Sequence, residues 1–135
     1  MARIICIDFG LKRVGVAVTD SLKIIASGLA TVENKNIIKF LEDYFSKEEV
    51  EKIVIGYPLN LDGTPTHATE AVERFIKTLN KKFRNIPVEK EDERFTSKMA
   101  TKAMIEGGVK KKKRRDKSLI DKVSATIILQ SYLEN

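Results

Sequence analysis

The chain has 135 residues, 42% of them hydrophobic, a size that fits one folded domain spanning residues 1–135. Its formal net charge of +6 favours an anionic partner, and its one cysteine and one histidine, Cys6 and His67, exclude an intrachain disulfide or a zinc cluster. No apolar stretch approaches the roughly 20 residues needed to cross a bilayer, and the first residues lack the pattern of a secretory signal, so we expect a cytoplasmic protein without a membrane partner.

An apolar run at residues 4–7 ends at Asp8, and a second apolar run follows at residues 14–18. Two β-branched runs joined by a short turn predict a β-hairpin. The hairpin places the Asp8 carboxylate at the end of the first strand, where such an acid often holds a metal ion, or a phosphate through one. The alternative is that Asp8 caps the turn at Gly10.

Strand and helix signals alternate along the rest of the chain. We expect a third strand at residues 24–32, a helix at 37–45 and a strand at 53–57. A helix whose start is marked by Thr64 and Pro65 follows, and then a strand from Pro87 to Asp92. The last two elements are a helix capped by Thr96 and ended by Gly107 and Gly108, and a final helix at 119–133. An antiparallel meander followed by this alternation predicts an α/β fold, with a mixed sheet and helices on its faces.

Acidic side chains stand at three predicted element ends, where the chemistry of such sheets gathers. Asp8 ends the first strand, Asp92 and Glu93 end the last strand, and Asp121 lies at the start of the final helix. A buried carboxylate is costly without a cation or hydrogen-bond donors. The three sites together therefore favour a shared role in binding a metal.

The helical spacing around Asp121 indicates its direction. Asp121 shares a helix face with Ala125, Ile128 and Tyr132, so its carboxylate is expected to point at the sheet, toward the end of the first strand. The alternative is a capping role at the helix start, in a box begun by Ser118.

Basic residues are concentrated between the last two predicted helices, at residues 109–117. The run contains Lys110, Lys111, Lys112, Lys113, Arg114 and Arg115. These cations repel one another unless an anion is near, so we expect them to contact the backbone of a nucleic acid. Lys12 and Arg13, in the turn after Asp8, are expected to contact the same partner. The alternative is a solvated surface without a ligand.

Four blocks of the sequence together resemble the YqgF/RuvX family, and the resemblance runs almost from end to end. The blocks are DFG followed by KRVGVAVTD at residues 8–20, IGYPLNLDG at 55–63, DERFT at 92–96 and IDKVSA at 120–125. They occur in the order and spacing of the family. The resemblance implies a ribonuclease-H-like fold and a metal-dependent nuclease, because family members are described as Holliday junction resolvases and as nucleases that mature the precursor of small-subunit ribosomal RNA.

Carried over by position, the resemblance implies that Asp8, Glu93 and Asp121 are the catalytic acids and the metal ligands, with Asp92 as a supporting or substitute ligand. Carboxylates suit Mg²⁺ or Mn²⁺, and two such ions with the substrate bound would assist phosphodiester hydrolysis. The expected function is processing of the small-subunit ribosomal RNA precursor, with structured RNA as the favoured partner and branched DNA as a possible one. We expect a monomer or a weak homodimer.

Three other functions remain open at this point. A Holliday junction resolvase would use the same acids on branched DNA. A non-catalytic nucleic-acid-binding factor would use the basic run while the acids serve as caps. An ATP-binding protein of the sugar-kinase or actin type shares the Asp-x-Gly opening, but it needs two lobes, and this chain has room for one.

Overall fold

The structure, a computed structural model, describes residues 2–60, 62–92 and 117–134. The strands within these residues are β1 (Arg3–Asp8), β2 (Arg13–Thr19), β3 (Ala26–Glu33), β4 (Val50–Tyr57) and β5 (Val88–Asp92). The helices are a 3-10 turn at Asn34–Asn36, α1 (Ile37–Lys47), α2 (His67–Lys82) and α5 (Lys117–Glu134). None of the described helices is long and apolar enough to cross a membrane.

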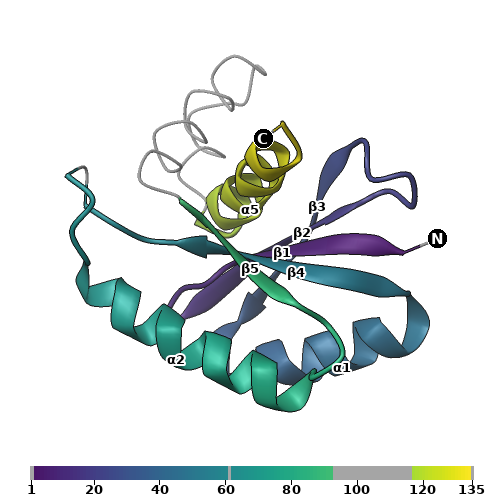
Figure 1. Cartoon of the computed structure of the whole chain (residues 1–135), viewed down its shortest axis with the longest axis horizontal. Coiled ribbons are helices and arrows are strands. Elements are labelled where there is room, and N and C mark those ends of the chain that lie inside the picture. Colours follow the sequence, from purple (N-terminus) through teal and green to yellow (C-terminus); the bar gives the residue numbers. More distant parts are fainter. Residues whose placement is uncertain (1, 61, 93–116, 135) are drawn as a thin grey trace.

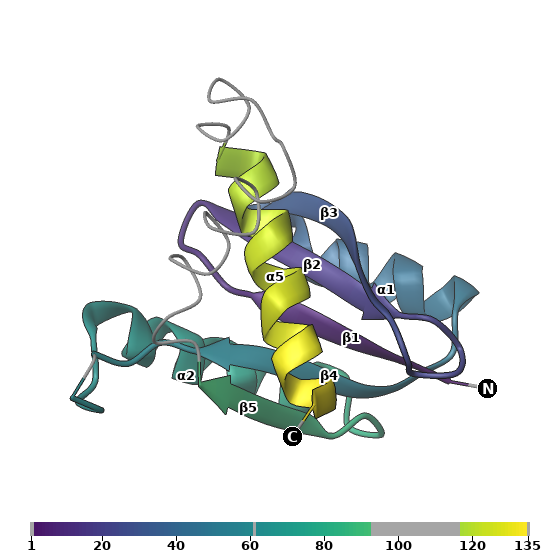
Figure 2. The same cartoon turned by 90° about the horizontal axis from the view of Figure 1, so that it is seen from above.

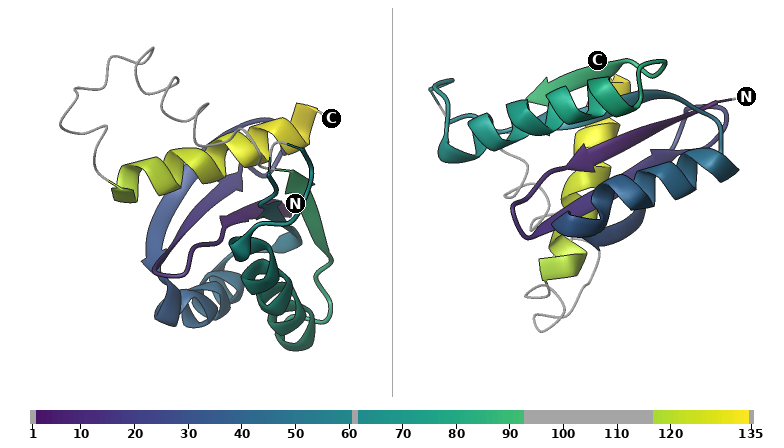
Figure 3. Two further views of the ribbon diagram at one scale, coloured as in Figure 1. Left: turned by 90° about the vertical axis from the view of Figure 1, so that its left-hand side faces the viewer. Right: turned by 90° about the horizontal axis from the view of Figure 1, so that it is seen from below.

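The five strands form one mixed sheet in the order β3-β2-β1-β4-β5. β1, β2 and β3 form an antiparallel meander, and β4 and β5 continue the sheet in parallel with β1. α1 and α2 cover one face and α5 lies across the strands on the other (Figures 1, 2 and 3). The predicted α/β architecture with a mixed sheet is therefore confirmed.

The side chains of β1 alternate between two apolar cores. Ile5 and Ile7 pack with α1 and α2 on one face of the sheet. Ile4 and Cys6 pack with α5 on the other face. Because strand side chains alternate with a period of two, Asp8 continues the second series and points toward the α5 face.

The third strand begins two residues later than predicted, because the side chain of Asp20 organises the preceding turn. Asp20 Oδ1 accepts hydrogen bonds from the amides of Ile24 and Ile25, at 2.8 and 2.9 Å. Within this turn Lys23 adopts a φ of 60°. The β-branched residues at 24 and 25 therefore belong to a side-chain-stabilised turn and not to β3.

The start of α2 also differs from the prediction. Its N-cap is Thr66, which accepts from the amide of Ala68 and forms a reciprocal capping box with Thr69. Thr64 instead belongs to the preceding turn, where its amide donates to Asp62 Oδ1 at 2.9 Å. The sequence contains several threonines that can cap a helix, and the Asp62 turn removes Thr64 from that choice.

Candidate active site

The carboxyl end of β1 and the first turns of α5 meet at one glycine. Asp8 pairs with Gly15 of β2 in the antiparallel register. A Cβ atom added to Gly15 would lie 2.1 Å from the main-chain oxygen of Asp121 and 3.3 Å from its Cβ. The backbone of α5 therefore rests on β2 directly beside Asp8, and two acids that are far apart in the sequence become neighbours on one face of the sheet.

Asp121 faces the sheet, as its helical spacing predicts. Ala125 and Ile128 on the same helix face are buried, and Tyr132 packs against the same core. The capping alternative is wrong, because α5 already includes Lys117 and Ser118, so Asp121 lies beyond its first turn. The side chain makes a tertiary contact instead.

That contact is an ion pair with Arg13. Arg13 Nε donates to Asp121 Oδ2 at 3.0 Å, and the two side chains are 35% and 27% exposed. Arg13 is two residues from Gly15 and has the same strand parity, so its side chain lies on the α5 face. A residue predicted only to contact nucleic acid therefore also contacts a predicted metal ligand, a link that its place in the sequence does not indicate.

The turn before Arg13 is tightly held. A Cβ on Gly10 would lie 2.4 Å from the main-chain oxygen of Arg13, so the chain closes on itself at a position that only glycine fits. Asn34 Nδ2 donates to the oxygen of Gly10 at 2.7 Å, and the amide of Asn34 donates to the oxygen of Lys12 at 2.9 Å. The backbone that carries Lys12 and Arg13 is thereby fixed beside the end of β1.

The strand parity of β5 indicates the face of the sheet on which its last residue, Asp92, lies. Lys90 contacts Glu73 of α2, whereas Glu89 accepts a hydrogen bond from Tyr132 of α5. Asp92 has the parity of Lys90 and therefore lies on the α2 face, opposite to the face that carries Asp8 and Asp121. This parity disfavours Asp92 as a ligand in the same site.

Several predicted site residues lie outside the described part of the chain. These are Glu93, Lys110, Lys111, Lys112, Lys113, Arg114 and Arg115. Within the described ranges, no three acidic, histidine or cysteine side chains are grouped so that they could hold a metal ion. Glu91, which the sequence analysis did not consider, has the α5 parity and pairs with Gly56 of β4.

Two clusters, each made of one tyrosine, one glutamate and one lysine, connect β5 to its neighbours, one on each face of the sheet. The Tyr57 cluster comprises Tyr57, Glu73 and Lys90, and the Tyr132 cluster comprises Lys52, Glu89 and Tyr132. In the first, Glu73 Oε1 lies 2.6 Å from the Tyr57 hydroxyl and 2.7 Å from Lys90 Nζ. In the second, Lys52 Nζ donates to the Tyr132 hydroxyl at 2.7 Å, and that hydroxyl donates to Glu89. This short edge strand is thus tied to β4, α2 and α5.

Acid is expected to weaken both clusters. The hydrogen bond from Lys90 lowers the pKa of Glu73, and the hydrogen bond from Tyr132 lowers the pKa of Glu89. A carboxyl with a lowered pKa in the folded state stabilises the fold above its unfolded pKa, and this contribution is lost as the pH falls through the folded pKa. We expect the Glu73→Gln/Glu89→Gln variant to unfold at lower urea than the wild type near neutral pH, with the difference shrinking as the pH falls through the lowered pKa values of the two carboxyls.

Urea unfolding midpoints measured across that pH range check this expectation. Glu42→Gln, on the exposed surface of α1, is the matched control and should follow the wild type at every pH. A difference between the double variant and the wild type that persists undiminished in acid would contradict the electrostatic explanation.

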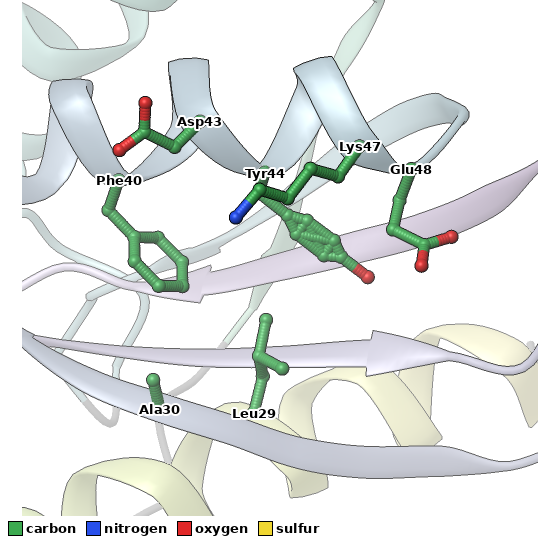
Figure 4. Close-up of a pocket in the computed structure, with 7 residues that line it drawn as sticks. All are labelled: Leu29, Ala30, Phe40, Asp43, Tyr44, Lys47 and Glu48. Atoms are coloured by element: carbon green, nitrogen blue, oxygen red, sulfur yellow. The ribbon is translucent and has the colours of Figure 1, made fainter.

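A pocket of about 480 Å³ lies between α1 and the edge strand β3 (Figure 4). The rings of Phe40 and Tyr44 point from α1 toward Leu29 and Ala30, with charged side chains at the rim. It lies on the face of the sheet that α1 covers and contains none of the predicted site residues. We place the candidate active site at the end of β1, where Asp8 and the backbone of Asp121 meet at Gly15, because the predicted acids lie there and not in this pocket.

Comparison with known proteins finds relatives that match nearly the whole chain. A family model described as "RuvX: Holliday junction resolvase" matches residues 2–135. A protein of Christiangramia forsetii is 58% identical over 133 residues, which are 98% of this chain and 98% of that protein. A relative from Flavobacterium psychrophilum is 50% identical, and the match covers 98% of this chain and 97% of that protein. A relative from Bacteroides thetaiotaomicron is 47% identical, and the match covers 100% of this chain and 98% of that protein. All three are provisionally named pre-16S rRNA nucleases.

A solved structure shares the architecture. T. thermophilus RuvC, in complex with a Holliday junction substrate, superposes with a TM-score of 0.58 at 15% sequence identity. The match covers 99% of this chain and 95% of that one. The chain therefore has the RuvC-like form of the ribonuclease-H fold, as the resemblance in sequence implies.

Proposed function

The chain belongs to the RuvX family, and from this we propose that it is a cytoplasmic, metal-dependent nuclease that processes the precursor of small-subunit ribosomal RNA. Relatives covered over nearly their whole length bear the corresponding name, among them the C. forsetii protein at 58% identity. The partner is a nucleic acid, with structured RNA favoured, and the protein acts as a monomer or a weak homodimer.

The observation that carries the proposal is the convergence of Asp8 and Asp121 at Gly15. Carboxylate oxygens are the ligands that Mg²⁺ and Mn²⁺ prefer, so these two side chains fit such ions. Glu93 is the third ligand of the proposed site. The choice of Glu93 follows the resemblance in sequence, and the parity of β5 disfavours Asp92, which has the parity of Lys90 on the α2 face.

Each group of residues has its own role in the proposed reaction. Asp8, Glu93 and Asp121 hold the ions, two of them once the substrate is bound. The chemistry that such ions would supply there is a nucleophilic water and compensation of the negative charge of the scissile phosphate. Lys12, Arg13 and the basic run at residues 110–115 bind the phosphate backbone and orient it across the edge of the sheet.

The proposal is tested with purified protein, Mg²⁺ or Mn²⁺, and three substrates: precursor ribosomal RNA, a four-way DNA junction and a plain duplex. Cleavage of the RNA that EDTA abolishes would support the proposal. Cleavage of the junction in preference to RNA would favour a Holliday junction resolvase, the second candidate, which the description of the family model supports. No cleavage of any substrate would favour a non-catalytic binding factor.

Neutralising the centre of the basic run should weaken binding and reduce its dependence on salt. We expect the Lys111→Gln/Lys112→Gln/Lys113→Gln variant to lose about one unit of log-log salt slope for each phosphate contact removed. Fluorescence anisotropy titrations of a labelled RNA between low and high salt measure this slope. An unchanged slope would assign the run to solvated surface.

A further inference from the structure

Among the described residues, Arg13 is a cation that pairs with a proposed metal ligand, Asp121. Its Nε lies 3.0 Å from Asp121 Oδ2, and each side chain is about one third exposed. The hydrogen bonds of Asn34 to Gly10 and Lys12 fix the backbone of the turn. A change in this contact therefore needs only side-chain rotation, and the strand can remain in place.

We propose that Arg13 is a charge-exchange residue, which holds the Asp121 carboxylate in the metal-free protein and releases it when a divalent ion binds. The released guanidinium is then available to a phosphate of the nucleic acid. This inference rests on the proposed function, because it takes Asp121 to be a metal ligand.

Electrostatics supports the exchange. Asp8 and Asp121 both adjoin Gly15, so a cation beside the two carboxylates lowers their mutual repulsion before any metal binds. A partly exposed ion pair is weak, so a divalent ion can displace Arg13 from the carboxylate. The pair also uses Nε, which leaves the two terminal nitrogens of the guanidinium outside this contact. Those nitrogens present the forked geometry that suits a phosphate.

A purely structural role for Arg13 leads to the opposite result. If Arg13 only positions Asp121, removing Arg13 lets the Asp121 side chain adopt other rotamers and weakens metal binding. If Arg13 competes with the metal, its removal strengthens metal binding. The sign of the change in affinity therefore decides between the two roles.

The first experiment measures Mn²⁺ binding by calorimetry in the absence of substrate. Arg13→Gln is expected to lower the Kd for Mn²⁺ by about two- to fivefold, the scale of a partly exposed ion pair. Lys12→Gln removes the same charge from the neighbouring position and is expected to have a smaller effect. An unchanged or higher Kd in Arg13→Gln, or an equal decrease in Lys12→Gln, would overturn the inference.

The second experiment measures RNA binding by anisotropy in EDTA, where neither metal nor cleavage contributes. Asp121→Asn should release Arg13 and tighten RNA binding by about two- to fivefold. Asp8→Asn removes the same charge from the neighbouring acid but keeps the ion pair of Arg13 with Asp121, so it should tighten binding less. The gain should disappear in Asp121→Asn/Arg13→Gln, and a gain that persists there would overturn the inference.

The same variants separate this inference from the proposed function. If Asp8→Asn and Asp121→Asn leave Mn²⁺ binding unchanged, the metal site itself is wrong. If both variants lose Mn²⁺ binding while Arg13→Gln behaves as the wild type, the site stands and only the exchange role of Arg13 fails.

Discussion

Asp8→Asn is expected to abolish metal-dependent cleavage while leaving the fold intact. The substitution removes one negative charge from the proposed metal site and barely changes the side-chain volume. Removing a residue that only supports a metal ligand lowers activity or metal affinity by about 10- to 100-fold. Removing the ligand itself should therefore lower the cleavage rate by at least ~100-fold. The measurement is the single-turnover cleavage rate in Mg²⁺, together with circular dichroism and the urea midpoint.

The matched control is Asp43→Asn, the same change on α1, which covers the opposite face of the sheet. It should cleave at the wild-type rate. Cleavage by Asp8→Asn at a comparable rate, in protein free of contaminating nuclease, would refute the metal role of Asp8 and with it the assignment of the active site.

The regular elements could be predicted because their signals are local. The apolar runs around Asp8 and Gly15 have the length and β-branching of paired strands, and a two-residue period separates their two faces. The helical spacing of Asp121 with Ala125 and Ile128 likewise indicated the side of α5 that meets the sheet. Periodicity of this kind is a property of one segment, so it can be read without knowing its neighbours.

The details of the candidate site could not be predicted, because they depend on contacts between distant segments. The ion pair of Arg13 with Asp121 and the contact of α5 with Gly15 join parts of the chain more than 100 residues apart. One local signal was present: a glycine inside a β-branched strand often marks a close approach of another backbone. Only the folded structure shows that the backbone approaching Gly15 is that of α5 at Asp121.

Gly15→Ala is expected to destabilise the protein and to lower its activity together. The added Cβ would lie 2.1 Å from the main-chain oxygen of Asp121. Because both atoms are attached directly to backbones, no side-chain rotation can relieve this clash. Overpacking of this kind costs about 1–3 kcal/mol. The helix must move away from β2, and the carboxylate of Asp121 moves with it, away from Asp8.

Gly28→Ala provides the matched control on the same face of the sheet. Its Cβ would meet Lys122 Cγ at 2.6 Å, Lys122 Cδ at 2.9 Å and Thr126 Oγ1 at 3.2 Å, which are side-chain atoms that can move without displacing the helix backbone. Urea unfolding and Mn²⁺ titration of both variants should therefore show a larger loss for Gly15→Ala than for Gly28→Ala. If Gly15→Ala retains wild-type stability and metal affinity, α5 does not rest on the strand at this point, and the convergence of Asp8 and Asp121 loses its structural basis.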